Sequence, residues 1–504
     1  MKYLKATLLL VLASNVSFAQ EVAPLWEEYV DFKLGNRKEA LLPDFSYAGY
    51  RFSEKDIPDH KDWKIFDVTD YGALPDDGGY DDQAIQKAID AAHAYSGGAV
   101  IYFPAGQYRI APDENREKYF AITRSKLIIR GAGKNETVIF QDKMRVGSRQ
   151  FRFYPKDLKE NKVATVIGKA ARESFWITVK DPSNLREGMD VVLKHQSEAY
   201  TRKYFEGKEL SPKWTRLFGP KGGMQIREIH TIAEIDGNRV RLANPLHIDV
   251  EELNGKGFEL YSYPHLEECG IENIHFKGNW SSYPEEFVHH KDGIHDGGWA
   301  AISMSNLKNS WIRNCKFEDW NETINLRAGY QVSFLNLDII GKKGHTSIHA
   351  RSGYGVLIKN CAFNGAHHHG PGTGYGGVGT VVTQCSMERD QIIDSHSGQP
   401  YATLFDDING GVFYNLGGPL PGLPHHGKHL VFWNFQYLSD RDFHYNFWSV
   451  DKRKNYTIAD PIFVGFKSNT KITFENEGRD QLRGKDVYPK SLFEEQLKLR
   501  LESK

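Results

Sequence analysis

The residues best suited to chemistry lie in a stretch rich in histidine and arginine that ends near residue 426. Two short segments there repeat one pattern, Ile324-Asn-Leu-Arg327 and Ile348-His-Ala-Arg351. Side chains alternate along a strand, so the apolar residues are predicted to point inward and the polar ones outward. Two arginines stacked on one face repel each other unless an anion is present, and a guanidinium fits a carboxylate or a sulfate.

β-Elimination at a uronic acid is the reaction that this set favours. It needs a cation for the C6 carboxylate, a base for the C5 proton and an acid for the departing C4 oxygen. Arg327 and Arg351 are predicted to neutralise the carboxylate. His349 or His345 is predicted to act as the base, and Tyr375 or a histidine as the acid. The predicted substrate-binding residues are Asn325, Lys343, His368, His369, His396, His425 and Trp299.

Metal ions are not required by this chemistry, and we predict no obligatory cofactor. Calcium is an alternative, with the adjacent Asp406 and Asp407 as its candidate ligands; these residues equally suit a closed turn. The histidine triplet 367–369 fits a polar turn or a transition-metal site. The CxxC and Cys/His spacings of structural zinc sites are absent from the sequence.

Two other function classes stay open. A glycoside hydrolase needs two carboxylates flanking the scissile bond. The combined Asn-Thr-Asp, Asp-Asp, Gly-His-Gly and Arg-Ile-Lys pattern of polygalacturonases is not present as a set. A non-catalytic glycan-binding protein is the third alternative, although the density of histidines favours proton transfer. The candidate carboxylates for hydrolysis are Glu322, Asp292, Asp296, Asp394, Asp406 and Asp407.

An internal repeat indicates the scaffold that positions these residues. Segments led by Asn314, Asn336, Asn360 and Gln384 recur at a spacing of 22 to 24 residues, the length of one parallel β-helix coil. The leading asparagines are predicted to point inward and to form a hydrogen-bonded ladder. Cysteines follow at three of the positions and are predicted to be inert core thiols.

The segments 66–73, 81–92 and 97–108 carry a recognisable signature. They read Phe-Asp-Val-Thr-Asp-Tyr-Gly-Ala, then an amphipathic helix that Asp81 or Asp82 can cap, then a strand ended by Pro104 and Gly106. This resembles the N-terminal cap of the pectate-lyase-like superfamily of exported bacterial polysaccharide lyases and glycoside hydrolases. The resemblance implies an all-β fold, a right-handed parallel β-helix with an N-terminal capping helix. It also implies that a β-rich insert can wall one side of the substrate groove.

The whole chain is consistent with an exported protein. A basic start, an apolar run and Ser17-Phe-Ala19 predict a signal peptide, hence a periplasmic or secreted location. The 64 basic and 65 acidic residues give no net pull toward nucleic acid, and no membrane insertion is expected. An anionic poly- or oligosaccharide is the predicted partner, and the oligomeric state stays open. The predicted regions are 1–19 signal peptide, 20–64 extension, 65–159 cap and first coils, 160–258 β-rich insert, 259–470 main coils, and 471–504 tail with a C-terminal helix.

Overall fold

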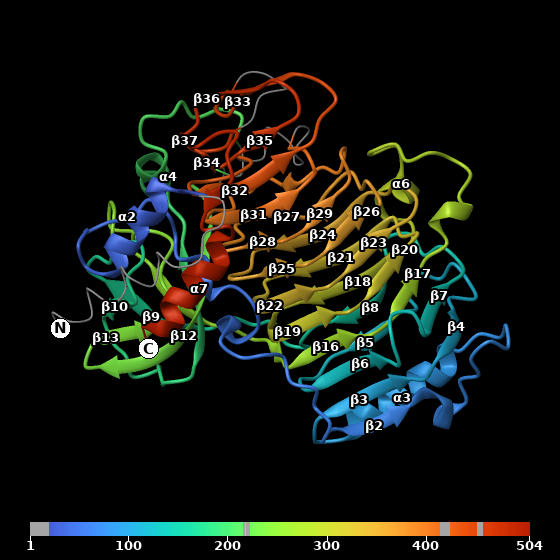
Figure 1. The fold of residues 1–504 in the computed structure, drawn as a ribbon. Coiled ribbons are helices and arrows are strands. Elements are labelled where there is room, and N and C mark those ends of the chain that lie inside the picture. Colours follow the sequence, from blue (N-terminus) through green and yellow to red (C-terminus); the bar gives the residue numbers. More distant parts are fainter. Residues whose placement is uncertain (1–19, 215–216, 218–221, 414–423, 451–456, 504) are drawn as a thin grey trace.

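A computed structural model shows a parallel β-helix with a small antiparallel barrel at its side (Figure 1). It describes residues 20–503 except 215–216, 218–221, 414–423 and 451–456. The predicted fold class is therefore confirmed. The predicted signal peptide lies outside the described residues. No helix in the described part of the chain has the length and apolar character to cross a membrane.

One face of the helix is a parallel sheet of seven strands. Each strand belongs to a successive coil, so side chains at equivalent positions line up from coil to coil. The strands, in spatial order, are β5 (Phe120–Ile122), β8 (Arg149–Phe153), β18 (Ala300–Ser305), β21 (Glu322–Arg327), β24 (Thr346–Arg351), β27 (Gly372–Gly374) and β30 (Asp394–Ser395).

The other faces belong to one continuous set of parallel pairings. Its N-terminal strands are β2 (Lys64–Asp67), β3 (Ala99–Phe103), β4 (Gly106–Ile110), β6 (Leu127–Gly131), β7 (Thr137–Gln141), β15 (Leu266–Glu267), β16 (Cys269–Glu272) and β17 (His275–Lys277). The later strands are β19 (Leu307–Arg313), β20 (Lys316–Glu318), β22 (Tyr330–Leu335), β23 (Asp338–Ile340), β25 (Leu357–Lys359), β26 (Ala362–Asn364), β28 (Val381–Thr383), β29 (Ser386–Met387), β31 (Thr403–Asn409), β32 (Leu430–Tyr437), β34 (Ile462–Val464), β35 (Lys467–Ser468) and β37 (Arg479–Gln481).

The repeat fills the interior with stacked apolar side chains. Phe276 and Phe317 stack with ring centroids 5.2 Å apart, and Phe432 and Phe463 stack at 4.9 Å. Such stacks remove equivalent apolar surface from water in every coil, the main stabilising contribution of a solenoid core. Cysteines continue this core, and the prediction of buried, unpaired thiols is confirmed. They are Cys269, Cys315, Cys361 and Cys385.

The asparagines that lead each repeat do not point inward, so that prediction is wrong. Asn314, Asn336 and Asn360 have φ values of 53°, 56° and 55°, in the left-handed region. The side chains of Asn336 and Asn360 are exposed. Asparagine recurs because it tolerates this backbone conformation at the bend between strands. One rung of the expected ladder is present, from Asn336 Nδ2 to Asn314 Oδ1 at 3.0 Å.

Helix α3 (Asp82–Ala94) closes the N-terminal end of the stack, with the predicted apolar face buried. The expected side-chain cap is absent. The Asp81 carboxylate accepts from the Leu74 and Arg109 amides at 2.9 and 3.0 Å. Asp82 accepts from the Ala111 amide at 3.1 Å. These carboxylates therefore tie the helix to the neighbouring loop and strand. The buried face comprises Ala84, Ile85, Ala88, Ile89 and Ala92.

The insert forms a closed antiparallel barrel of six strands. It packs through a shared apolar cluster against the turns of the helix and against the N-terminal extension. Helix α4 (Glu198–Tyr204) lies within the insert. The barrel strands are β9 (Lys162–Ile167), β10 (Trp176–Val179), β11 (Asp190–His195), β12 (Ile226–Asp236), β13 (Arg239–Leu242) and β14 (Glu259–Ser262).

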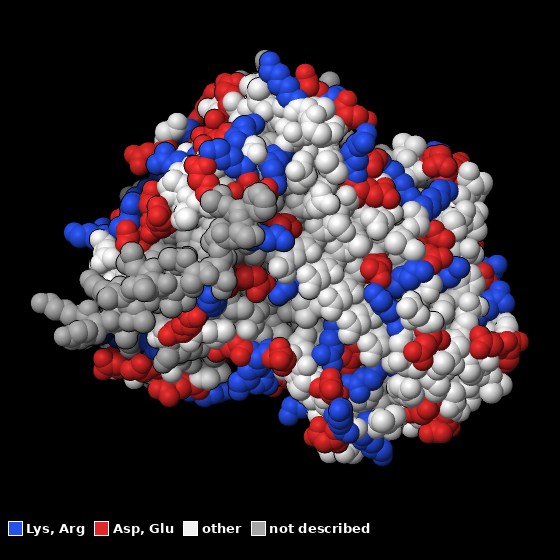
Figure 2. All heavy atoms as spheres, viewed as in Figure 1, with Lys and Arg blue, Asp and Glu red and all other residues white. Residues whose placement is uncertain are grey.

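Both ends of the described chain pack together on the outside of the coils. The predicted C-terminal helix is α7 (Leu492–Glu502), and the extension contributes α2 (Pro24–Lys33). Arg500 donates to Ser46 Oγ at 2.8 Å. Short strands complete this region: β1 (Glu21–Val22) pairs with β38 (Val487–Tyr488), and β33 (Phe443–Asn446) with β36 (Ile472–Glu475). Charges of both signs are interspersed over the face seen in Figure 2, with no large patch of one sign.

Candidate active site

The predicted polar face exists across strands β18, β21 and β24. Asn325 pairs with His349, and Arg327 pairs with Arg351. The alternate residues belong to the hydrophobic core, as the alternation predicts. Asn325 is half-buried and Arg327 is exposed at the end of its strand. The core residues of these two strands are Ile324, Leu326, Ile348 and Ala350.

The register slips by one residue at the next coil, so glycines rather than polar side chains lie in register with His349 and Arg351. Gly372 and Gly374 pair with His349 and Arg351, and Thr373 is fully buried. Glycine is required at position 372, where the backbone lies against its neighbour, and the space at Gly374 is tight. A Cβ atom at Gly372 would lie 2.0 Å from the Asp394 carbonyl oxygen, and one at Gly374 would lie 3.1 Å from His349 Nε2.

His349 is buried beneath Arg351 and is not placed to act as the predicted base. Arg351 donates from Nε and Nη2 to His349 Nδ1 at 3.0 and 2.9 Å. A guanidinium has no acceptor, so the Nδ1 lone pair is occupied and the ring proton resides on Nε2. Burial and the neighbouring Arg351 hold the pKa of His349 well below its usual value. His349 therefore fixes the orientation of the guanidinium.

Asp394 organises the histidines of this face. Its Oδ2 atom lies 2.8 Å from His396 Nδ1 and 3.2 Å from His369 Nδ1. Burial alone would raise the pKa of Asp394, but these two imidazoles lower it well below its usual value. A charged carboxylate keeps the proton of each imidazole on Nδ1 and leaves Nε2 as an acceptor. His396, predicted only to bind substrate, is therefore the better placed base.

Tyr375, the predicted acid, lies in the turn after β27, because Gly374 takes the position in register with Arg351. Its ring still lies beside the other polar groups, 5.2 Å from Arg351 Cζ and 6.0 Å from the His396 ring centroid. The Tyr375 backbone is held by a 2.6 Å hydrogen bond from Ser352 Oγ to its carbonyl oxygen. Arg351, Tyr375 and His396 thus lie together on this face.

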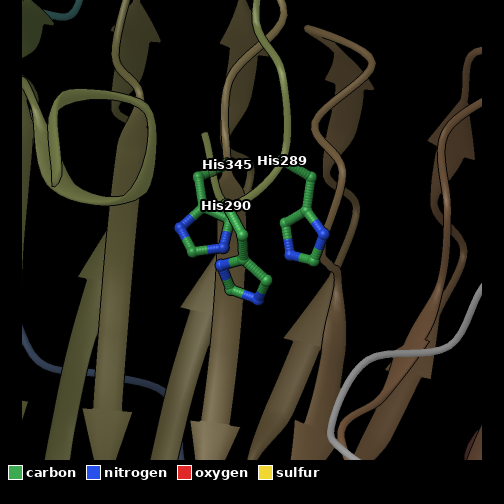
Figure 3. A group of neighbouring side chains, drawn as sticks. All are labelled: His289, His290 and His345. Atoms are coloured by element: carbon green, nitrogen blue, oxygen red, sulfur yellow. The ribbon is translucent and has the colours of Figure 1, made fainter. Parts of the chain in front are cut away.

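Five histidines, which we call the histidine cluster, lie beside this face. They are His289, His290, His345, His368 and His369. His289 and His290 come from the loop between β17 and α6 (Gly293–Gly297), and the others come from the turns before β24 and β27. Figure 3 shows His289, His290 and His345 gathered over the strands. His289 Nε2 lies 3.0 Å from His369 Nε2.

Sequence reasoning found three members of the histidine cluster and missed His289 and His290. The loop between β17 and α6 that carries them interrupts the regular spacing of the coils, so counting along the repeat cannot place these two histidines. The adjacent histidine pair, followed by the acidic turn Asp292–Asp296, was the available signal. Asp292 caps α6 by accepting from the Ile294 and His295 amides at 2.9 and 3.0 Å.

Three residues that were predicted to bind substrate or calcium have structural roles instead. Trp299 is buried, and its Nε1 atom donates to the Asp142 carbonyl oxygen at 3.3 Å. His425 is buried, with its Nδ1 atom 3.1 Å from Thr457 Oγ1. Asp406 accepts from the Leu492 amide at 2.9 Å at the start of α7, so its carboxylate is used by the helix and does not suit a calcium site. Lys343 is half-buried beside the histidine cluster.

The barrel adjoins the far end of this face. The Gln225 carbonyl oxygen accepts from Gln399 Nε2 at 3.2 Å. Gln225 also lines a cleft of about 670 Å³ on the barrel, together with Lys194, Arg227 and Tyr261. A Cβ atom at Gly376 would lie 3.5 Å from the same Gln225 oxygen, so the barrel lies next to the turn that follows Tyr375. That the insert walls a substrate groove stays a prediction.

Comparison with known proteins agrees with this fold. A family model described as rhamnogalacturonase A/epimerase, pectate lyase-like, matches residues 65–186. A second, described as a domain of unknown function (DUF4955), matches residues 366–504 and includes Tyr375, Asp394 and His396. The tailspike protein gp49 from Pseudomonas phage LKA1 superposes with a TM-score of 0.51 at 12% identity, over 83% of this chain and 76% of the tailspike. The chain is a right-handed parallel β-helix protein, and its residues 65–186 are similar to the pectate-lyase-like family.

Curated relatives match a short part of the chain. Mannuronan C5-epimerase AlgE3 of Azotobacter vinelandii is 49% identical over 74 residues, which are 15% of this chain and 4% of the epimerase. Alginate lyase 7 of the same organism is 43% identical over 74 residues, 15% of this chain and 8% of the lyase. The chain thus spans a small fraction of the relatives that it matches.

Proposed function

We propose that the chain is a carbohydrate-active lyase that acts by β-elimination on a uronic-acid-containing glycan. The observation that carries this proposal is the convergence of a half-buried arginine, a tyrosine and an Asp–His pair on one face of the β-helix. The leaving group is a glycosidic oxygen within the chain, or water at a terminal uronate.

Each group has a role in the proposed reaction. Arg351 pairs with the C6 carboxylate and so makes the C5 proton easier to remove. His396 Nε2 takes that proton while Asp394 stabilises the imidazolium. The C5–H electrons form the C4–C5 double bond as the C4–O bond breaks, and the Tyr375 hydroxyl gives its proton to the departing oxygen. Proton return from His396 to Tyr375 restores both groups.

The names of the curated relatives support a uronate as substrate and supply the second candidate function. Both a mannuronan C5-epimerase and an alginate lyase match the chain. Epimerisation begins with the same removal of the C5 proton, but a proton then returns to the opposite face and no bond to C4 breaks. A C5-epimerase is therefore the runner-up, and the fate of the C5 carbanion separates the two.

The hydrolase alternative is less well supported because its candidate carboxylates are engaged elsewhere. Glu322 pairs with Arg149 Nη2 at 2.5 Å, and burial raises the Glu322 pKa although Arg149 opposes this. Asp394 is buried between two imidazoles. The others are tied to local partners: Asp292 to α6, Asp296 to His290, Asp406 to α7 and Asp407 to Lys490.

Absorbance near 235 nm tests the proposal directly. The protein is incubated with mannuronan, alginate, polygalacturonate and sulfated uronate polymers, and with their oligosaccharides. A rise marks a C4–C5 double bond conjugated to the carboxylate, and mass spectrometry then identifies the leaving group. If the reaction is run in D₂O, incorporation of deuterium at C5 without a rise in absorbance identifies an epimerase. New reducing ends without either signal would overturn both.

A matched pair of arginine variants tests the assignment of the carboxylate partner. Arg351→Ala is expected to lower kcat by roughly 10² to 10³-fold, because a preorganised cation is lost where charge develops. Arg327 lies in register on the neighbouring strand but is exposed. Arg327→Ala is expected to raise KM by less than about tenfold, because an exposed ion pair is screened by solvent. Equal losses in both variants would contradict the assignment.

A further inference from the structure

The histidine cluster contains more ligand-type nitrogens than the proposed elimination uses. His289 belongs to two groups whose ligand atoms all lie within 4.8 Å of one another. One group joins it to His290 and His345, and the other joins it to His368 and His369. Polar side chains gathered this closely need a ligand or a shared proton network to offset their desolvation.

Second contacts fix the tautomers of two rings around His289. His345 Nδ1 donates to the Asp296 carbonyl oxygen at 2.8 Å. His369 Nδ1 faces the charged Asp394 carboxylate at 3.2 Å. In both rings the Nε2 atom is consequently the lone-pair nitrogen. An imidazole whose other nitrogen is bound to a carboxylate or backbone carbonyl is the usual arrangement of a metal ligand.

Ring geometry selects three of the five histidines. The His289, His345 and His369 centroids lie 5.5, 4.9 and 5.1 Å apart, with interplanar angles of 45°, 75° and 62°. Three imidazoles bound to one tetrahedral ion at 2.0–2.1 Å place their centroids about 5 Å apart. The His290 and His368 rings instead lie 3.7 and 3.9 Å from the His289 ring, closer than the spacing of imidazoles on one tetrahedral ion.

We propose that His289, His345 and His369 bind one divalent transition-metal ion of the zinc class. Figure 3 shows that His289 and His345 each turn a ring nitrogen toward the space between them. The 3.0 Å separation of His289 Nε2 and His369 Nε2 is close to that of two ligands on one ion. Imidazole donors select such an ion over calcium or magnesium, which prefer oxygen.

The site has a direct link to the proposed catalytic groups. Asp394 contacts the ligand His369 and the base His396 through the same Oδ2 atom. Three histidine ligands leave a fourth position open, the arrangement of ions that bind a substrate oxygen.

Metal content of the untagged chain tests the site without reference to any activity. The protein is stripped with a chelator, titrated with Zn²⁺ and measured by mass spectrometry and calorimetry. One equivalent is expected for the native chain and for His444→Ala, a control at an exposed histidine that bonds Thr473 and Glu475. His289→Ala, His345→Ala and His369→Ala are each expected to lose at least tenfold in affinity. Asp394→Asn is expected to lose roughly 10- to 100-fold, as outer-shell substitutions do.

Two measurements on the native chain keep the proposal testable if a variant fails to fold. Co²⁺ substitution is expected to give visible absorption bands of tetrahedral strength. Anomalous diffraction at the zinc edge is expected to place the ion among the three Nε2 atoms. Less than one equivalent of Zn²⁺ in the native chain, or unchanged affinity in His289→Ala, would overturn the site. These outcomes are independent of whether the chain proves to be a lyase.

Discussion

Two buried aspartates in the last coils have the same burial, but their pKa values are shifted in opposite directions. Asp394 and Asp406 are both fully buried. Asp394 faces the imidazoles of His369 and His396, which hold its pKa well below the usual value. Among the described residues no cation contributes to the shift at Asp406; burial raises its pKa to about 7, although donors such as Ser491 and Leu492 oppose the shift. The partner rather than the depth of burial decides whether a carboxylate is charged.

The two aspartates also differ in what they contact: Asp394 contacts the groups of the proposed active site, and Asp406 contacts a helix of the scaffold. Asp394 is a charged group that orients the imidazoles of His369 and His396 through their Nδ1 atoms. Asp406 accepts hydrogen bonds from the Thr383 hydroxyl at 2.9 Å and from the Leu492 and Phe493 amides at 2.9 and 3.2 Å. It thereby attaches α7 to strand β31. Substitution of each aspartate should accordingly affect a different property.

Asp394→Asn should have the largest effect. The amide keeps the shape of the carboxylate but no longer holds the Nδ1 proton on His396, so the base is present in the wrong tautomer. A kcat lower by roughly 10³ to 10⁴-fold is expected, as for other bases that lose an orienting carboxylate. The measurement is the initial rate at 235 nm, with circular dichroism to verify folding. An unchanged kcat would mean that His396 is not the base.

Asp406→Asn should leave kcat within about twofold and change the dependence of stability on pH. In the folded chain the Asp406 carboxyl keeps its proton up to a pKa of about 7, whereas it ionises near 3.8 when unfolded. The stabilisation is therefore complete below about pH 4 and lost as the pH rises through 7. It amounts to about 4 kcal/mol.

Urea unfolding from pH 4 to pH 8 measures this effect. Asparagine does not titrate, so the difference in unfolding free energy between native chain and variant should shift in favour of the variant as the pH rises. Parallel stability curves would show that the Asp406 carboxyl is ionised in the folded chain throughout, and the contrast with Asp394 would disappear.

The fold could be predicted because its signals are local and repeated. The spacing of Asn314, Asn336 and Asn360 sets the coil length, and the apolar face of the segment 82–94 identifies the cap. The prediction of an inward asparagine ladder was wrong because asparagine also suits a bend with left-handed backbone conformation. Spacing alone does not distinguish the two.

The site could be predicted only where the repeat is regular. Arg327, His349 and Arg351 fell on the expected face. At β27 the glycines shift the register by one residue, which a count from the asparagines cannot detect. The roles of His349 and His396 depend on which nitrogen each partner occupies, and that requires the contacts of Arg351 and Asp394 in three dimensions.

Asp407→Asn should have the smallest effect. It tests whether Asp407, the neighbour of Asp406, contributes to stability or binds a metal ion. Asp407 has a φ of 50°, a conformation that asparagine adopts readily, and its partner Lys490 is 3.5 Å away and exposed. The unfolding free energy should change by less than about 0.5 kcal/mol. Calorimetric titration with Ca²⁺ should give the same result for the native chain and for the variant, with no heat of binding in either. Calcium-dependent stabilisation lost in Asp407→Asn would instead make this pair a metal site and require the α7 contacts of Asp406 to open.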